Sequence, residues 1–118
     1  MNEELSPFLP LSPATLHILL ALAGGEQHGY GIMKEVARQT EGQYRLGPGT
    51  LYDNLQKLLD RGLVREAPKR SANDDPRRRY YQLTPFGRRV LFADLVRLEN
   101  VLREAKVRLR TADWSKST

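Results

Sequence analysis

The sequence contains no cysteine, which excludes a disulfide framework and any metal site built from thiolates. It has only two histidines, His17 and His28, and no acid or thiol accompanies either at metal-ligand spacing, so we expect no bound metal ion. The longest apolar run, residues 18–23, is far too short to span a bilayer. The acidic start of the chain lacks the basic residues of a secretory signal. We therefore expect a cytoplasmic protein with no membrane segment and no cofactor.

Catalytic arrangements are also missing from the sequence. The carboxylates are scattered over polar helix faces, and the sequence shows no arrangement of a nucleophile with a general base. We therefore expect no enzymatic activity. The length of 118 residues, with 40% hydrophobic and 28% charged residues, suits one globular domain with a modest core.

The positive charge is unevenly distributed along the chain. Residues 1–60 carry four Lys or Arg and seven Asp or Glu, a net charge of −3. Residues 61–89 carry nine and three, a net of +6, and residues 90–118 carry six and four, a net of +2. A localised basic segment of this kind is typical of nucleic-acid-binding proteins.

Residues 47–62 form the clearest predicted helix. Gly47 suits the cap, Pro48 the first helical position, and Gly62 the left-handed residue after the end. Leucines at helical spacing form one apolar face, whereas the opposite face is polar and rich in hydrogen-bond donors. Such a helix suits insertion into a DNA groove.

Other signals predict the elements around this helix. We expect helices over residues 13–23 and 29–40, an extended link or minimal strand over 43–46, and strands over 63–67 and 79–83. Residues 85–110 predict a long last helix, in which Gly87 indicates a close approach by neighbouring backbone. The predicted fold is mainly α (α+β): a winged helix-turn-helix with a long C-terminal dimerisation helix.

The predicted organisation has four parts. Residues 1–12 contain Pro7, Pro10 and four large apolar residues, and Pro13 follows directly, so we expect an extended arm packed on another surface, with a second subunit as one candidate. Residues 13–84 form the DNA-binding domain and 111–118 a loose tail. The last helix, 85–110, carries an a/d stripe that predicts a homodimer interface. The stripe consists of Leu91, Leu95, Leu98, Leu102, Ala105 and Leu109.

Two segments supply the predicted contacts to double-stranded DNA. On the helix over 48–60 we select hydroxyl, amide and ammonium groups together with the first turn: Pro48, Gly49, Thr50, Tyr52, Asn54 and Lys57. On the flanks of the hairpin we select the basic residues Lys69, Arg70, Arg77, Arg78 and Arg79. The alternative for any single one of these residues is that it is a solvated surface residue with no contact to DNA. Arg79 adjoins a strand and could have a structural role instead.

His28 and Tyr30, at the start of the second helix, have two interpretations. With Gly29 and Gly31 they could place backbone N–H groups against a DNA phosphate, or they could lock the turn between the first two helices. Trp114 in the tail could stack on an effector, fold back on the dimer, or do neither.

Three stretches together resemble the PadR family of bacterial transcriptional regulators. They are His28-Gly29-Tyr30-Gly31-Ile32, then Gly49-Thr50-Leu51-Tyr52 with Gly62-Leu63-Val64, and Arg79-Tyr80-Tyr81-Gln82-Leu83-Thr84 followed by Gly87 and Leu91. The resemblance covers residues 16–109, and the single C-terminal helix is similar to the smaller subgroup. It implies a homodimeric repressor that is released from its operator by a small, often aromatic or amphipathic, effector of unknown identity.

Two other functions fit a winged helix. One is a protein–protein adaptor, since fold alone does not fix function, although an adaptor has no need of the +6 charge over residues 61–89. The other is an RNA binder, which should show no preference for duplex DNA with two-fold symmetry.

Overall fold

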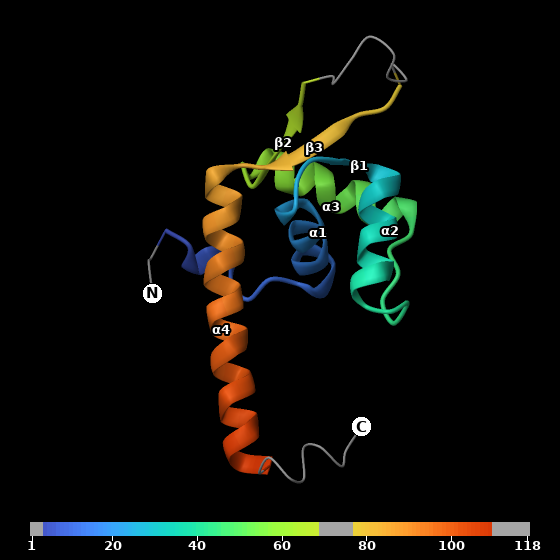
Figure 1. The fold of residues 1–118 in the computed structure, drawn as a ribbon. Coiled ribbons are helices and arrows are strands. Elements are labelled where there is room, and N and C mark those ends of the chain that lie inside the picture. Colours follow the sequence, from blue (N-terminus) through green and yellow to red (C-terminus); the bar gives the residue numbers. More distant parts are fainter. Residues whose placement is uncertain (1–3, 69–76, 110–118) are drawn as a thin grey trace.

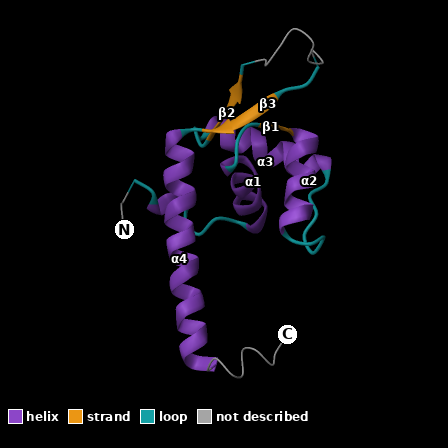
Figure 2. Cartoon of the chain, viewed as in Figure 1, coloured by secondary structure: helices purple, strands orange, loops and turns teal. Residues whose placement is uncertain are grey.

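The computed structural model describes residues 4–68 and 77–109 and confirms the winged helix-turn-helix (Figures 1 and 2). Within these two ranges, a short 3-10 helix, Ser6–Phe8, precedes four α-helices and three strands. In chain order these are α1 (Pro13–Ala23), β1 (Gln27–His28), α2 (Gly29–Gln39), α3 (Pro48–Asp60), β2 (Val64–Ala67), β3 (Tyr80–Leu83) and α4 (Pro85–Leu109).

Helix α1 lies at the centre of the domain, in contact with α2, α3, α4 and β3. Its sequence is apolar on nearly all sides, and Ile18, Leu19 and Leu22 are fully buried, as expected for a helix with neighbours all round. The Ser12 hydroxyl accepts a hydrogen bond from the Thr15 N–H and Pro13 occupies the first turn, so the predicted cap is present.

The sheet has three antiparallel strands in the order β1-β3-β2. The two predicted strands pair as expected, with Val64 opposite Leu83 and Ala67 opposite Tyr80. The third strand, Gln27–His28, was not predicted; it pairs with Tyr81 and Tyr80. Residues 43–46, predicted as an extended link or a minimal strand, form no strand.

Local hydrogen bonds explain why residues 43–46 form no strand. The Thr40 hydroxyl donates to the Val36 carbonyl and lies 3.1 Å from both the N–H and the carbonyl oxygen of Tyr44, so the Tyr44 backbone groups are already engaged. The chain turns sharply just before, at Glu41 and Gly42, both of which have positive φ. Side-chain bonding of this kind competes directly with strand pairing.

The start of α4 is joined to the turn between α3 and β2. The Thr84 hydroxyl donates to the Gly62 carbonyl and accepts from the Gly87 N–H, and the Thr84 N–H donates to the Leu63 carbonyl. A Cβ at Gly87 would collide with the Leu63 carbonyl oxygen. The predicted backbone approach at Gly87 is therefore confirmed.

The N-terminal arm packs on its own chain. Leu5 is buried, Phe8 lies edge-on to Phe86 at 5.3 Å between ring centroids, and Glu4 pairs with Arg89 at 3.3 Å. The Leu11 N–H lies 3.4 Å from Oδ1 of Asp94, which is fully buried. These contacts place the arm against α4.

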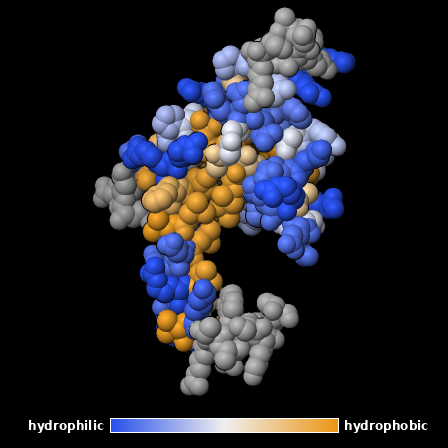
Figure 3. All heavy atoms as spheres, in the orientation of Figure 1, coloured by the Kyte–Doolittle hydropathy of each residue, from blue (hydrophilic) through white to orange (hydrophobic). Residues whose placement is uncertain are grey.

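The second half of α4 extends beyond the rest of the domain (Figure 1). Of the predicted a/d stripe, Leu91 belongs to the core, whereas Leu95, Leu102 and Leu109 are exposed. Further apolar residues at the surface were not predicted: Phe92, Val96, Val101 and Val107. Figure 3 shows apolar residues gathered at the level of α1 and the first half of α4, and again along the projecting half.

Candidate nucleic-acid interface

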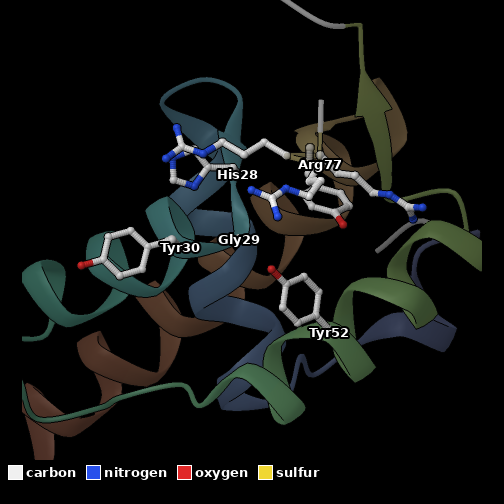
Figure 4. Close-up of a pocket in the computed structure, with 8 residues that line it drawn as sticks. His28, Gly29, Tyr30, Tyr52 and Arg77 are labelled. Carbon is white, nitrogen blue, oxygen red and sulfur yellow. The ribbon is translucent and has the colours of Figure 1, made fainter. Parts of the chain in front are cut away.

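One cavity brings together the N-terminus of α2, the side of α3 and the base of the hairpin (Figure 4). Its volume is about 370 Å³, and every described residue that lines it, apart from Gly29, has an aromatic or basic side chain. The lining residues are His28, Gly29, Tyr30, Tyr52, Arg77, Arg78, Arg79 and Tyr81. Six of the predicted DNA-contacting residues thus meet in one place, although they come from three separate stretches of sequence.

Tyr52 and Gly29 join α3 to α2 within this cavity. The Tyr52 hydroxyl points toward Gly29, and a Cβ at Gly29 would collide with that hydroxyl and with the ring carbon that bears it. Glycine is therefore needed at this position for the tyrosine to lie where it does. Tyr52 is 49% exposed and lines the cavity.

His28 caps α2. Its Nδ1 accepts a hydrogen bond of 3.0 Å from the Gly31 N–H, while its ring lies edge-on to Tyr80 and stacks on Tyr30. Burial, and then the positive charge of Arg78, lower the pKa of His28, which favours the neutral ring that the cap requires. These contacts support the interpretation that His28 locks the turn. Tyr30 is 62% exposed and available for a partner.

The three described arginines of the hairpin differ in their surroundings. All are exposed, but Arg79 Nε lies 3.6 Å from Oε1 of Glu66 on the neighbouring strand, which gives it a structural contact. Arg77 and Arg78 line the cavity together with Arg79. Burial, with Tyr52 and Glu66 next, raises the pKa of Tyr81, so its hydroxyl stays a hydrogen-bond donor. The predicted residues Lys69 and Arg70 lie outside the described residues, as does Trp114.

The exposed face of α3 continues from this cavity. Pro48, Gly49, Thr50 and Lys57 are all exposed, as predicted. Gln56 is exposed too and donates to Asp60 Oδ1 at 3.0 Å; the sequence analysis missed it, although it follows Tyr52 by one helical turn.

Asn54 departs from the prediction. It is half-buried, its Oδ1 accepts from the Thr15 hydroxyl at 3.3 Å, and its Nδ2 donates to the Thr50 carbonyl at 2.8 Å. These bonds turn its amide toward α1 and away from the exposed face.

A second groove continues from the cavity along α2. It has a volume of about 590 Å³ and includes Lys34, whose ammonium lies 5.5 Å from the centre of the Tyr30 ring. Lys34 follows Tyr30 by four residues, a spacing that places both on one helix face and that could have identified it from sequence. Arg38 in this groove is paired with Glu35 at 2.7 Å.

Within residues 4–68 and 77–109, no group of three or more His, Asp or Glu side chains could hold a metal ion. In the same ranges, no helix is both long and apolar enough to cross a membrane. The site is instead a wide, basic and aromatic surface built on helix and strand ends. Such a surface can bind phosphates through cations, hydroxyls and backbone N–H groups.

Comparison with known proteins identifies the family. Residues 18–93 match the model of the transcriptional regulator PadR-like family. A transcriptional regulator of Mycobacterium tuberculosis is 39% identical over 89 residues, which cover 75% of this chain and 78% of that protein.

Solved structures agree on the fold. A transcriptional regulator from Clostridium thermocellum has a TM-score of 0.66 at 21% identity, covering 94% of this chain and 98% of that one. PadR of Bacillus subtilis in complex with operator DNA has a TM-score of 0.60 at 24% identity, covering 70% and 46%. BpsR of Bordetella bronchiseptica, whose DNA binding is regulated by 6-hydroxynicotinic acid, has a TM-score of 0.68 at 20% identity, covering 93% and 71%. The match to the family model over most of the chain shows that this protein belongs to the PadR-like family of transcriptional regulators.

Proposed function

We propose that the protein is a homodimeric repressor that binds a pseudo-palindromic operator near its own or a neighbouring gene and is released by a small effector. The observation that carries the proposal is the meeting of α3, the α2 N-terminus and the hairpin arginines on one surface (Figure 4). The PadR–operator complex among the structural neighbours supports DNA as the partner.

In this proposal the two edges of α3 contact the DNA backbone. Tyr52, Arg77 and Arg78 bind phosphates on one edge, with Tyr30 beside them, and Lys57 binds a phosphate on the other. Gln56, on the exposed face between these edges, reads a base, since a glutamine amide can pair with the N6 and N7 groups of adenine. Asn54, which the sequence favoured for a base contact, takes a positioning role because its amide joins α3 to α1.

The exposed apolar side of α4 forms the dimer interface in this proposal. Leu95, Leu102 and Leu109, the exposed leucines of the a/d stripe, would otherwise present large apolar side chains to water along one side of the helix. The helix has 25 residues, a length of about 38 Å at 1.5 Å per residue. A two-fold axis at this interface gives two copies of α3 and hence two half-sites about 34 Å apart.

Regulation by a ligand is supported by BpsR, whose DNA binding responds to 6-hydroxynicotinic acid. The likeness to that protein lies in the fold, so the ligand itself is not transferred to this chain.

Paired variants test the DNA-binding surface. Lys57→Ala and Arg78→Gln should each weaken operator binding on every sequence. Each should also reduce the slope of log affinity against log salt concentration by about 0.9 per lost phosphate contact, or about 1.8 per dimer. Arg108→Gln is the matched control, because Arg108 lies in the last turn of α4 and is paired with Glu104. If all three variants lost affinity equally, the effect would come from net charge alone and the assigned surface would be wrong.

A further inference from the structure

An apolar groove runs along the first half of α4, beside the N-terminal arm. Its volume is about 570 Å³, and every described residue that lines it is either apolar or an arginine. These residues are Leu5, Pro85, Arg88, Arg89, Phe92 and Ala93. Phe92 is 68% exposed, and Val96, about one helical turn further on, is 43% exposed. Exposed apolar side chains gathered in one groove are typical of a contact surface.

The a/d stripe does not account for this groove. Successive residues of an α-helix lie about 100° apart around its axis, so Phe92 points about 100° away from Leu91, where the stripe begins. Val96 is displaced from Leu95 by the same angle of about 100° and in the same direction. A second copy of α4 packed along the stripe therefore leaves the groove open on its flank.

The chain has one segment whose chemistry suits the groove. Residues 110–118, which lie outside the described residues, contain Trp114, the only tryptophan of the sequence, and Asp113, the only acidic residue of the segment. A tryptophan ring buries a large apolar area and is the best ring partner for an arginine guanidinium. Arg88 and Arg89 are both exposed and line the groove. An indole next to a carboxylate thus complements a groove that is apolar and basic.

The tail of the same chain is too short to reach the groove. Leu109, the last residue of α4, follows Arg89 by twenty residues, which is about 30 Å along the helix axis. The five residues from Leu109 to Trp114 span at most about 18 Å, and the remaining distance of about 12 Å exceeds the length of a tryptophan side chain. The groove must therefore take its occupant from another copy of the chain.

An antiparallel partner brings its tail to the groove. Two antiparallel copies of α4 that pack about Leu102, the middle of the exposed part of the stripe, place Leu109 of the partner subunit opposite Leu95. Arg89 lies six residues before Leu95, about 9 Å along the axis. The reach of about 18 Å covers this distance together with the quarter turn around the helix.

We propose that the tail of the partner subunit docks in this groove, with its Trp114 against Phe92 and its Asp113 paired with Arg88. The two α4 helices are then antiparallel, and each subunit fills the groove of the other. The inference rests on the dimer of the proposed function and adds to it the direction of the helices and a second contact outside the stripe. DNA takes no part in it, so the tests need no operator.

The fluorescence of Trp114 reports its docking, because the chain has no other tryptophan. In the dimer of the full chain, its emission should lie at shorter wavelength than that of N-acetyltryptophanamide in water, with weaker quenching by acrylamide. Phe92→Ser should move the emission to longer wavelength and strengthen the quenching. Val107→Ser is the matched control, because Val107 is 71% exposed, lies on α4 outside the groove and is within reach of the tail of its own chain. A solvent-exposed Trp114 in the wild-type dimer, or a response to Val107→Ser rather than to Phe92→Ser, would overturn the docking.

Disulfide cross-linking identifies the subunit that supplies the tail, because the chain has no cysteine of its own. The double variant Ala93→Cys, Ser115→Cys should oxidise to a covalent dimer on a non-reducing gel, since a disulfide needs Cβ atoms about 4 Å apart. Each single variant should run as a monomer. A disulfide within one chain, or no disulfide at all, would contradict the proposal. This pair changes neither Phe92 nor Trp114, so it remains informative if Phe92→Ser fails to fold.

Sedimentation equilibrium separates this inference from the dimer itself. Trp114→Ala should raise the dimer dissociation constant at least about thirty-fold, the effect of losing one interface hot spot. An unchanged constant would overturn the docking and leave the dimer standing. A wild-type protein that sediments as a monomer would overturn both. Circular dichroism verifies that each variant is folded.

Discussion

Replacing Gly87 with alanine tests how α4 is joined to the winged domain. In an open helix this change stabilises the protein by about 1 kcal/mol, because alanine has the higher helix propensity. Here the new Cβ would collide with the Leu63 carbonyl oxygen, which is backbone and cannot rotate away. Overpacking of this kind costs about 1–3 kcal/mol, and separating α4 from the turn also weakens the bond from the Thr84 N–H to the Leu63 carbonyl, worth about 1 kcal/mol.

The balance predicts a net destabilisation of about 2 kcal/mol, which lowers the melting temperature by about 8 °C for a chain of this size. The assay is thermal and urea denaturation at one fixed subunit concentration, since the stability of a dimer depends on concentration. Gly49→Ala is the matched control, because Gly49 is also helical and a Cβ there meets nothing within 4 Å. If Gly87→Ala were as stable as Gly49→Ala, the close approach at Leu63 would be refuted.

Three further predictions concern the pH dependence of stability, the assembly of the dimer and the recognition of the operator sequence. Because the folded state lowers the pKa of His28, its contribution to stability is fully present above the unfolded pKa of about 6.5 and is lost as pH falls through the lower folded value. The free energy of unfolding should therefore decrease between pH 7 and pH 5. His28→Asn, which keeps a capping side chain, should remove that part of the decrease, and an unchanged pH profile would contradict the assignment. Leu102→Glu should give a folded monomer by analytical ultracentrifugation, since Leu102 belongs to the a/d stripe and is exposed in the projecting half of α4; a stable dimer would contradict the proposed interface. Gln56→Ala should relax preference between operator variants, whereas Asn54→Ala should weaken binding to all of them equally; the reverse pattern would restore the base contact to Asn54.

The helices were predictable because their ends carry strong local signals. Capping and stop residues act within one turn of a helix, so sequence alone located α1 and α3. The start of α1 is marked by Ser12 and Pro13, the start of α3 by Gly47 and Pro48, and the end of α3 by the left-handed Gly62. The strand at Gln27–His28 depends instead on pairing with Tyr80 and Tyr81, more than fifty residues away, and two residues carry no periodicity.

The candidate site was predictable in part for the same reason. Tyr52, Arg77 and Arg78 were identified by residue type and by their place on a helix face or hairpin flank, and the structure brings them together. The orientation of Asn54 was not predictable, because it is set by Thr15 from another helix. The position of the arm was not predictable either. The path of residues 5–12 over α4 is set by the tertiary contacts of Phe8 and Leu11.

The most direct test of the central claim is fluorescence anisotropy of the wild-type protein with a duplex from upstream of its own gene and with a scrambled duplex, over a salt series. The account predicts tight binding that prefers the upstream duplex, with log affinity falling against log salt at a slope near −7 if about eight phosphates are contacted per dimer. Weak binding that is equal on both duplexes, with a shallow slope, would contradict a sequence-specific regulator that uses this surface.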